Sequence, residues 1–363
     1  MCGDVMIGRG IDQILPHPCD PVLYEPFVKN AEYYVKLAEY LNGPIKRPVD
    51  YSYIWGDAIG VLNKMKPDIR LINLETTITL SDDYWKDKEI HYRMNPKNID
   101  CLKVARIDCC SLANNHILDW GYKGLQETLE ILKKAGIKYA GAGMSIQEAE
   151  YPAILEVGEK GRVIIFSCGL GSSGIMPEWA AEEKRPGVNL LKDLTDRTIS
   201  HIRERVYEVK RNGDVALFSV HWGGNWGYAI PEYQVDLAHR LIDDAGIDII
   251  HGHSSHHVKG IEVYSGKLIL YGCGDLLNDY EGIGGYEEFR DDLTLMYFAD
   301  VNLSDGRLIN LIMIPMQIKN LRLNSASQKD RQWLSGVLNR EGQRFGTRVK
   351  TEGEVLILDW KEP

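Results

Sequence analysis

The chain has 363 residues, of which 44% are hydrophobic and 26% are charged, an ordinary composition for a globular protein. Its 42 lysines and arginines against 52 aspartates and glutamates give a net charge of −10. This charge argues against a nucleic acid or an anionic membrane as the main partner, because both select basic surfaces.

No stretch of the sequence predicts a membrane span or an export signal. No run of 18 apolar residues occurs, and the first residues lack a charged segment followed by an apolar one. The seven cysteines form no CxxC pair, which indicates reduced thiols. We therefore expect a cytoplasmic protein with no membrane partner.

Strand-like and helix-like runs alternate along most of the chain. In chain order, we expect strands at 69–74, 107–112, 162–167, 215–220, 247–250, 260–264 and 268–271. Amphipathic stretches at 123–135, 194–211 and 233–245 predict helices. This βαβ alternation predicts an α/β fold.

Two segments depart from this alternation. Residues 11–66 contain six prolines and many aromatic residues around a helix-like run at 27–41, and they are too long for a simple connection. We interpret them as an insertion, either a lid or substrate-binding element or a packed structural excursion. From about residue 285 to 363 we expect a β-rich extension that completes the sheets. It would contain strands at 293–301, 307–318 and 355–360 and one helix at 328–339. Because no linker-like stretch occurs, we predict a single domain over 1–363.

Five polar clusters follow strand-like runs, which is where ligands bind in open α/β sheets. The first is Asp4, in GDVMIGRG, and the second is Glu75, in RLINLETTIT. Each has a structural alternative, because Gly-Asp is a common turn and a strand-end glutamate can simply be solvated or paired.

The third cluster is SLANNHILDWG, at 111–121, which contains Asn114, Asn115, His116 and Asp119. An amide oxygen can ligate a hard metal ion, and the adjacent histidine can donate or accept a proton. An Asn-Asn turn with a helix cap would explain the asparagines alone.

Histidines dominate the last two clusters. His221 ends a strand in FSVHWGGNWGY, where Trp222 and Trp226 are expected to flank a site. The run HGHSSHH, at 251–257, places His253 and His256 three residues apart. Neutral imidazoles that converge after a strand suit a transition metal, and an exposed histidine-rich turn is the alternative.

Together the clusters supply two carboxylates, one amide and three imidazoles. This set suits Mn²⁺, Fe²⁺ or Zn²⁺ better than Ca²⁺ or Mg²⁺. With one bridging carboxylate, such a set would serve two ions about 3.5–4 Å apart.

The ordered set of motifs resembles the CapA family, which is named for capsule and poly-γ-glutamate biosynthesis and is related in fold to calcineurin-like metallophosphatases. The matching stretches run across residues 3–275 and are GDVMIGRG, INLETTIT, SLANNHILDWG, HWGGNWGY and GHSSHHVKGIEVYSGKLILYGCGD. The resemblance implies a four-layer α/β/β/α metallophosphatase-like sandwich with two divalent metal ions.

The resemblance also implies a role for each site residue. One ion would be held by Asp4, Glu75 and His256, and the other by Glu75, Asn115, His221 and His253, with Glu75 bridging. His116 and Asp119 are the expected catalytic residues, with His116 moving the proton. Met6 stands where metallophosphatases usually have a histidine, so one ion loses an imidazole.

The remaining candidates concern substrate binding. Arg9 and Lys259 would bind an anionic group, although each has a structural cation as its alternative. The expected substrate-binding set is completed by Asn114, Trp222, Trp226 and Asp275.

Three functions fit these residues. The first is a hydrolase that acts on a peptide-like amide of the γ-glutamyl type or on a phosphoester, in poly-γ-glutamate or capsule-type metabolism. The second is a metal-dependent peptide epimerase in which a histidine removes the α-proton. The third is a non-catalytic, metal-stabilised assembly subunit. The partner would be a peptide-like or anionic small molecule, and the oligomeric state stays open. Capsule-type members are typically membrane-anchored. Because this sequence shows no anchor, we expect a soluble relative here.

Overall fold

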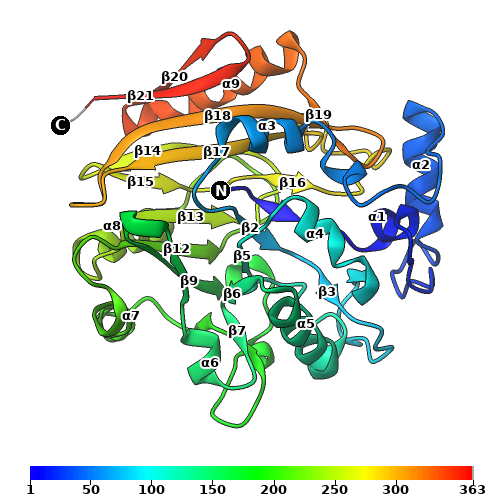
Figure 1. Ribbon diagram of the computed structural model, residues 1–363, viewed down its shortest axis with the longest axis horizontal. Helices are drawn as coiled ribbons and strands as arrows, with labels where there is room; N and C mark the ends of the chain where they lie inside the picture. The colour runs from blue at the N-terminus through cyan, green and yellow to red at the C-terminus, as the bar shows by residue number, and fades with distance from the viewer. Residues whose placement is uncertain (362–363) are drawn as a thin grey trace.

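The computed structural model describes residues 1–361. Two largely parallel sheets lie at its centre, and an antiparallel sheet lies along one edge (Figure 1). The first sheet is wholly parallel and has the order β16–β1–β2–β5–β6. Its strands are β1 (Asp4–Val5), β2 (Leu71–Leu74), β5 (Cys109–Ser111), β6 (Lys138–Ala140) and β16 (Asp275–Leu277).

The second sheet has the order β11–β9–β12–β13–β15–β14, with β8 paired to β9. Only β8 and β14 run antiparallel to their neighbours. Its strands are β8 (Ala153–Glu156), β9 (Arg162–Leu170), β11 (Leu190–Leu191), β12 (Val215–His221), β13 (Ile249–His253), β14 (Ile261–Tyr264) and β15 (Lys267–Leu270). Each strand expected between 69 and 271 is found, within two or three residues of its predicted bounds.

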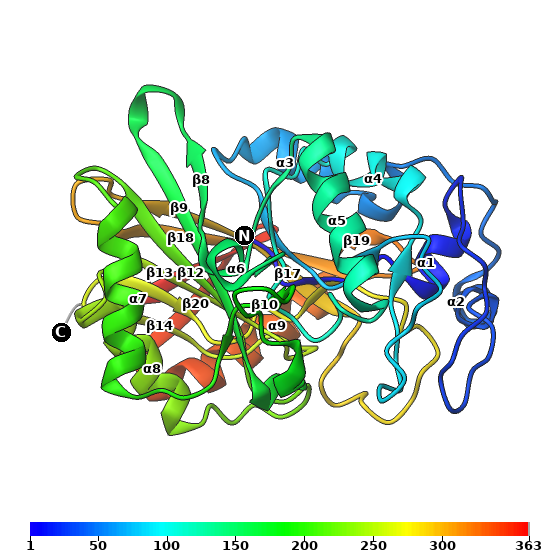
Figure 2. The ribbon, with the colours of Figure 1, turned by 90° about the horizontal axis from the view of Figure 1, so that it is seen from below.

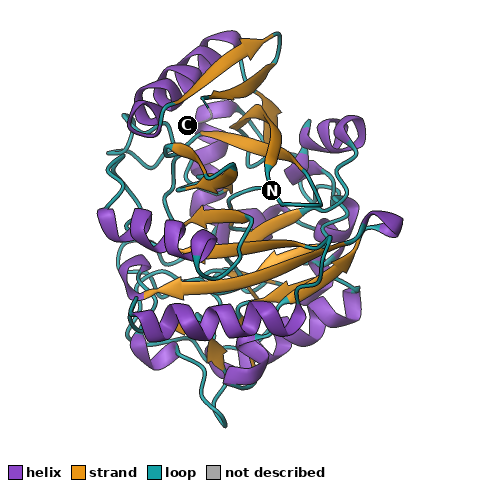
Figure 3. Ribbon diagram, turned by 90° about the vertical axis from the view of Figure 1, so that its left-hand side faces the viewer, coloured by secondary structure: helices purple, strands orange, loops and turns teal. Residues whose placement is uncertain are grey.

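Helices cover the outer face of each parallel sheet. The first sheet carries α3 (Ala58–Met65), α4 (Asp100–Val104) and α5 (Gly121–Ala135), and the second carries α7 (Asp196–Val209) and α8 (Glu232–Asp243). Figure 2 shows these helices outside the strands, and Figure 3 shows helices on the outside of the sheets.

Alternation along the strands separates the cores of the sandwich. Cys109 and Ile165 pack between the two sheets, whereas their neighbours Cys110 and Ile164 pack under the outer helices. Successive side chains of a strand point to opposite faces, so each buried strand serves two cores. The predicted four-layer α/β/β/α sandwich is confirmed.

The C-terminal strands form a sheet of their own, so the expectation that they complete the parallel sheets is wrong. Their bounds are β17 (Leu293–Val301), β18 (Leu308–Ile318), β19 (Leu323–Ser325), β20 (Thr347–Glu352) and β21 (Val355–Trp360). A short connection makes β17 and β18 antiparallel partners over their whole length. Leu295 and Met313 of this pair enter the core between the parallel sheets, and α9 (Gln328–Gly342) packs on the same sheet.

Residues 11–66 divide into a packed and a projecting part. Trp55 and Leu62 pack on the outer face of the first sheet, whereas Phe27 and Tyr40 are 95% and 86% exposed. The projecting part contains α2 (Glu32–Asn42) at the far edge in Figure 1. The shorter elements of the molecule are α1 (Arg9–Ile14), α6 (Ile146–Glu150) and the pairs β3 (Thr77–Ile78) with β4 (Arg93–Met94) and β7 (Ala142–Gly143) with β10 (Gly187–Val188).

Residues 1–361 contain neither a disulfide nor a helix that could span a membrane. All seven cysteines are buried and unpaired. Within the same range, no helix combines the length and the apolar character that a membrane crossing needs.

Candidate metal centre

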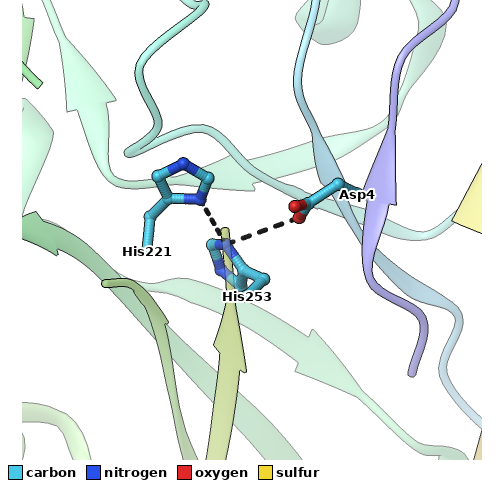
Figure 4. A group of neighbouring side chains, drawn as sticks. All are labelled: Asp4, His221 and His253. Atoms are coloured by element: carbon cyan, nitrogen blue, oxygen red, sulfur yellow. Dashed lines mark hydrogen bonds and ion pairs between the residues drawn. The ribbon is translucent and has the colours of Figure 1, made fainter. Parts of the chain in front are cut away.

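The carboxyl ends of strands from both sheets meet at one place. Asp4 on β1 lies in register with Asp275 on β16, although 271 positions separate them in the sequence. His221 and His253 end the neighbouring strands β12 and β13 in register. Figure 4 shows His253 linked both to His221 and to the Asp4 carboxylate. The Nδ1 atoms of the two histidines lie 2.8 Å apart, and His253 Nδ1 lies 3.7 Å from Asp4 Oδ1.

Two groups of potential metal ligands share Asp4. The first comprises Asp4, His221 and His253, and the second comprises Asp4, His256 and Asp275. In each group the ligand atoms lie within 4.8 Å of one another, and all these residues are buried. The geometry therefore makes Asp4, rather than Glu75, the carboxylate common to both groups.

The two other expected ligands lie at the edge of these groups. Asn73 Nδ2 donates to Asp4 Oδ1 at 2.8 Å and to Glu75 Oε2 at 3.1 Å, which brings the two carboxylates together. Asn115 Oδ1 lies 3.0 Å from His221 Nε2. All six residues expected to hold metal therefore converge, and Asp275, expected to bind substrate, joins them.

A buried chain of hydrogen bonds orients His253. The carbonyl oxygen of Cys2 can only accept, so His251 Nε2, at 2.9 Å, carries a hydrogen and its Nδ1 is bare. That Nδ1 accepts from the Ser219 hydroxyl, and the Ser219 oxygen then accepts from His253 Nε2, both at 2.9 Å. His253 consequently presents a bare Nδ1 to the site, which is the state that a metal ligand requires.

Replacing Ser219 with alanine should weaken metal binding by about 10- to 100-fold, because the His253 tautomer is no longer fixed. The measurement is competition of the protein with a chelator for Zn²⁺. Ser167→Ala is the matched control, since Ser167 is the register neighbour of Ser219 but bonds to Ser111. Equal affinities of the two variants would contradict the assignment.

The electrostatics of the cluster call for cations. Burial and the neighbouring Asp275 raise the pKa of Asp4 to about 7, and burial together with Asp4 raises the pKa of Glu75 well above its ordinary value. Burial lowers the pKa of His221 and His253, so their imidazoles are neutral. Clustered carboxylates with neutral imidazoles, closed from water, fit divalent ions of the Mn²⁺, Fe²⁺ or Zn²⁺ type.

His116 and Asp119 form a pair beside these groups. His116 Nδ1 lies 2.7 Å from Asp119 Oδ2, and its Nε2 faces Glu75 Oε1 at 3.7 Å. Burial lowers the pKa of His116 to about 4. Burial opposes the ionisation of Asp119, but His116 and Lys88 hold the pKa of this carboxyl below its ordinary value. Lys88, which the sequence analysis missed, bonds to Asp119 Oδ1 at 2.6 Å.

The expected substrate-binding residues divide into two sets. Trp226 lies at the site, with its ring 5.2 Å from that of His256 and stacked on Tyr286. Trp222 is buried in the core under α7 and α8, where its Nε1 donates to the carbonyl oxygen of Tyr271 at 2.9 Å. Trp226 thus supplies an aromatic wall, and Trp222 does not reach the site.

Asn114 and Arg9 have their polar groups engaged within the protein. Asn114 Nδ2 donates to Asn73 Oδ1 at 3.0 Å, and its Oδ1 accepts from the backbone N–H of His116. Arg9 is buried and forms ion pairs with Asp279 and Glu25. Asn114 thus supports Asn73, which bonds to Asp4, and the charge of Arg9 is compensated by two carboxylates.

Lys259 is a buried lysine whose ammonium has few polar partners and no ion-pair partner among residues 1–361. It is 5% exposed, and its Nζ reaches only the carbonyl oxygen of Ala229, at 3.4 Å. Among residues 1–361, no carboxylate lies within ion-pair distance of it. Burial lowers its pKa to about 8.

Replacing Lys259 with methionine should raise the free energy of unfolding at pH 7, because the variant no longer buries an ammonium. The advantage should shrink by about 3 kcal/mol as pH rises from 8 to 10.5, since only the unfolded wild-type chain keeps the proton in this range. Urea unfolding of both proteins across this range measures the difference. A difference that does not change with pH would contradict the expectation.

The comparisons with known proteins agree with the motif pattern. A family model described as "Bacterial capsule synthesis protein PGA_cap" matches residues 1–280. This chain belongs to that family. The predicted membership is confirmed, and the match includes every expected site residue while leaving β17 to β21 and α9 outside it.

Named relatives cover most of the chain. A probable polyglutamine synthesis accessory protein of Mycobacterium tuberculosis is 49% identical over 98% of this chain and 93% of its own length. The PGA biosynthesis protein CapA of Bacillus subtilis is 32% identical over 83% of this chain and 67% of its own length. A crystal structure described as a novel phosphatase from Mycoplasma pneumoniae shares 12% identity, with a TM-score of 0.45 over 76% of this chain and 89% of that one. This last similarity is too low to support an argument.

Proposed function

We propose that this chain is a two-metal hydrolase. The observation that carries the proposal is the pair of buried ligand groups that share Asp4, with the His116–Asp119 pair next to them. A buried cluster of three carboxylates and three imidazoles has little structural use, because ionised carboxylates are costly to bury unless cations compensate them. Two divalent ions account for the whole set.

The residues would divide between the ions as the two groups do. His221 and His253, with Asn115 beside them, would serve one ion, and His256 and Asp275 would serve the other. Asp4 would belong to both, and Glu75 lies between the groups and His116. When bound, such ions polarise the scissile carbonyl or phosphoryl group and acidify water.

The chain's own residues supply the rest of the chemistry. His116 moves a proton at Nε2, the nitrogen that faces the site, while Asp119 holds the ring from behind. Trp226 and Tyr286 stack at 4.0 Å and form an apolar wall. The six carboxylate and imidazole side chains of the cluster are at most 6% exposed, namely Asp4, Glu75, His221, His253, His256 and Asp275. Bulk water would therefore be excluded around the reacting groups.

The substrate we propose is a peptide-like amide of the γ-glutamyl type, with a phosphoester as the second class. Support comes from the relatives, which are named for polyglutamine synthesis and PGA biosynthesis. The test is incubation of the Mn²⁺-loaded protein with poly-γ-glutamate, γ-glutamyl peptides and a phosphoester, followed by detection of new amines or phosphate. Turnover by the wild type that is absent from His116→Gln supports the proposal. Equal turnover by both proteins would contradict it.

A non-catalytic assembly role is a second candidate, and the word "accessory" in the name of the Mycobacterium tuberculosis relative favours it. In that case the metal ions would stabilise the fold and leave His116 without a chemical task. A polymer-synthesis assay in which His116→Gln supports wild-type yield would favour this candidate over the hydrolase.

An epimerase is the third candidate, and the closed, water-poor site favours it. Removal and return of an α-proton by a histidine needs such a site but cleaves no bond. Incubation in D₂O separates the two enzymes, because only the epimerase would label the substrate α-carbon without producing a new amine.

A further inference from the structure

The connection between β16 and β17 supplies aromatic side chains beside His256. Tyr280, near its start, packs edge-on against the His256 ring, with the ring centroids 5.3 Å apart. Trp226 tilts against the same His256 ring at 5.2 Å. Tyr286 of the connection stacks on Trp226 at 4.0 Å, with the two rings only 7° from parallel. One face of Trp226, next to the metal centre, is therefore covered by a side chain of this connection.

Residues 282–288 of the connection are anchored at both ends and loosely held between them. Before them, the Glu281 carboxylate accepts from the backbone N–H of Leu321 at 2.6 Å. After them, Arg290 pairs with Asp330 of α9 at 2.8 Å. Within the described part of the chain, this segment makes hydrogen bonds only inside the connection. The segment can therefore change its path while its two ends stay in place.

Two glycines give the segment conformational freedom just before the stacked ring. Gly282 and Gly285 have φ angles of +85° and +103°, a region that residues with side chains rarely adopt. Tyr286 follows directly and is 38% exposed. A stacked aromatic pair contributes only about 2- to 12-fold to an equilibrium constant beyond its area burial. The stack of Tyr286 on Trp226 is thus readily exchanged for a similar one.

We propose that the face of Trp226 covered by Tyr286 is a substrate subsite for a planar amide group. Tyr286 holds this place in the ligand-free protein. Segment 282–288 then swings Tyr286 away, and the amide plane of a peptide-like substrate stacks on Trp226 in its stead. Phe289, which stacks on His257 at 4.7 Å, stays beside the subsite.

The subsite selects among the substrate classes of the proposed function. An amide group has a flat face, whereas a tetrahedral phosphoryl group has none, so stacking on Trp226 favours the amide. Because Trp226 contacts the ring of His256, an amide bound there lies beside the metal centre. The inference rests on the proposed hydrolase for the identity of the substrate, and it adds the place where that substrate binds.

The test is the affinity of a γ-glutamyl dipeptide for the Zn²⁺-loaded protein carrying His116→Gln, which should not consume the ligand. The protein is labelled with 5-fluorotryptophan, and Trp226→Phe assigns the ¹⁹F signal of Trp226. Titration should shift this signal and give the dissociation constant. When Tyr286→Ala is added, the dissociation constant should fall by about 2- to 12-fold, because the dipeptide no longer displaces a stacked ring.

Ile283→Ala is the matched control, because Ile283 lies in the same segment and is also 38% exposed; it should leave the affinity unchanged. The proposal is overturned by the absence of binding, by binding that leaves the Trp226 signal in place, or by equal or weaker binding to Tyr286→Ala. Turnover of the dipeptide by the wild type is measured separately. Turnover without tighter binding by Tyr286→Ala would remove the subsite and leave the hydrolase. Tighter binding without turnover would do the reverse.

Discussion

Replacing Asp4 with asparagine should remove both metal ions, because Asp4 is the ligand that the two groups share. Metal should then no longer stabilise the protein. For the wild type, metal at 100 times its dissociation constant should add about 2.7 kcal/mol to the free energy of unfolding. For Asp4→Asn the added metal should change this free energy little. Denaturant unfolding with and without Mn²⁺ measures both values.

In metal-free protein, the same substitution should not lower the free energy of unfolding. Burial and Asp275 raise the pKa of Asp4 to about 7, so its ionised form destabilises the metal-free fold, progressively from its unfolded pKa up to pH 7. At pH 8 the metal-free asparagine variant should thus be at least as stable as the metal-free wild type. Asp248→Asn is the control, since Asp248 is a buried carboxylate paired with Lys210 and Lys267 before β13. Retention of both ions by Asp4→Asn would contradict the shared-ligand assignment.

Replacing His116 with glutamine should reduce turnover by about 10²- to 10⁴-fold while leaving the metal content unchanged. We expect the metal content to stay unchanged because His116 faces Glu75 at 3.7 Å but belongs to neither ligand group. The measurement pairs kcat with elemental analysis on the same preparation.

His239→Gln is the matched control for this prediction. His239 lies on α8 and pairs with Glu262, and the substitution should leave both turnover and metal unchanged. Loss of metal from His116→Gln would show that His116 is a ligand, and unchanged turnover would remove it from the chemistry.

Much of the site could be predicted because its residues stand in local patterns. Each of Glu75, Asn115, His221 and His253 lies at or just after the end of a strand with a clear apolar run. Parallel strands bring their carboxyl ends to one edge, so strand prediction alone placed these residues together. The alternation of strands and helices predicted an α/β fold, and the resemblance of the motifs to the CapA family implied the four-layer architecture.

The residues that were missed or differently placed depend on contacts between distant segments. Lys88 lies in an irregular connection 28 positions before His116, and no spacing rule links the two. Asp275 was expected to bind substrate, because nothing in GCGD indicates that β16 pairs with β1 beside Asp4. Trp222 follows a strand next to the site, but its side chain turns to the opposite face of the sheet. The separate C-terminal sheet arises from the pairing of β17 with β18, which strand prediction does not specify.

The most direct test of the central claim is the metal content of the purified protein, measured by elemental analysis. The account predicts about two divalent ions per chain, and their loss from the His253→Ala/His256→Ala double variant. Absence of bound metal in the wild type, even after reconstitution with Mn²⁺, Zn²⁺ and Ca²⁺, would contradict it.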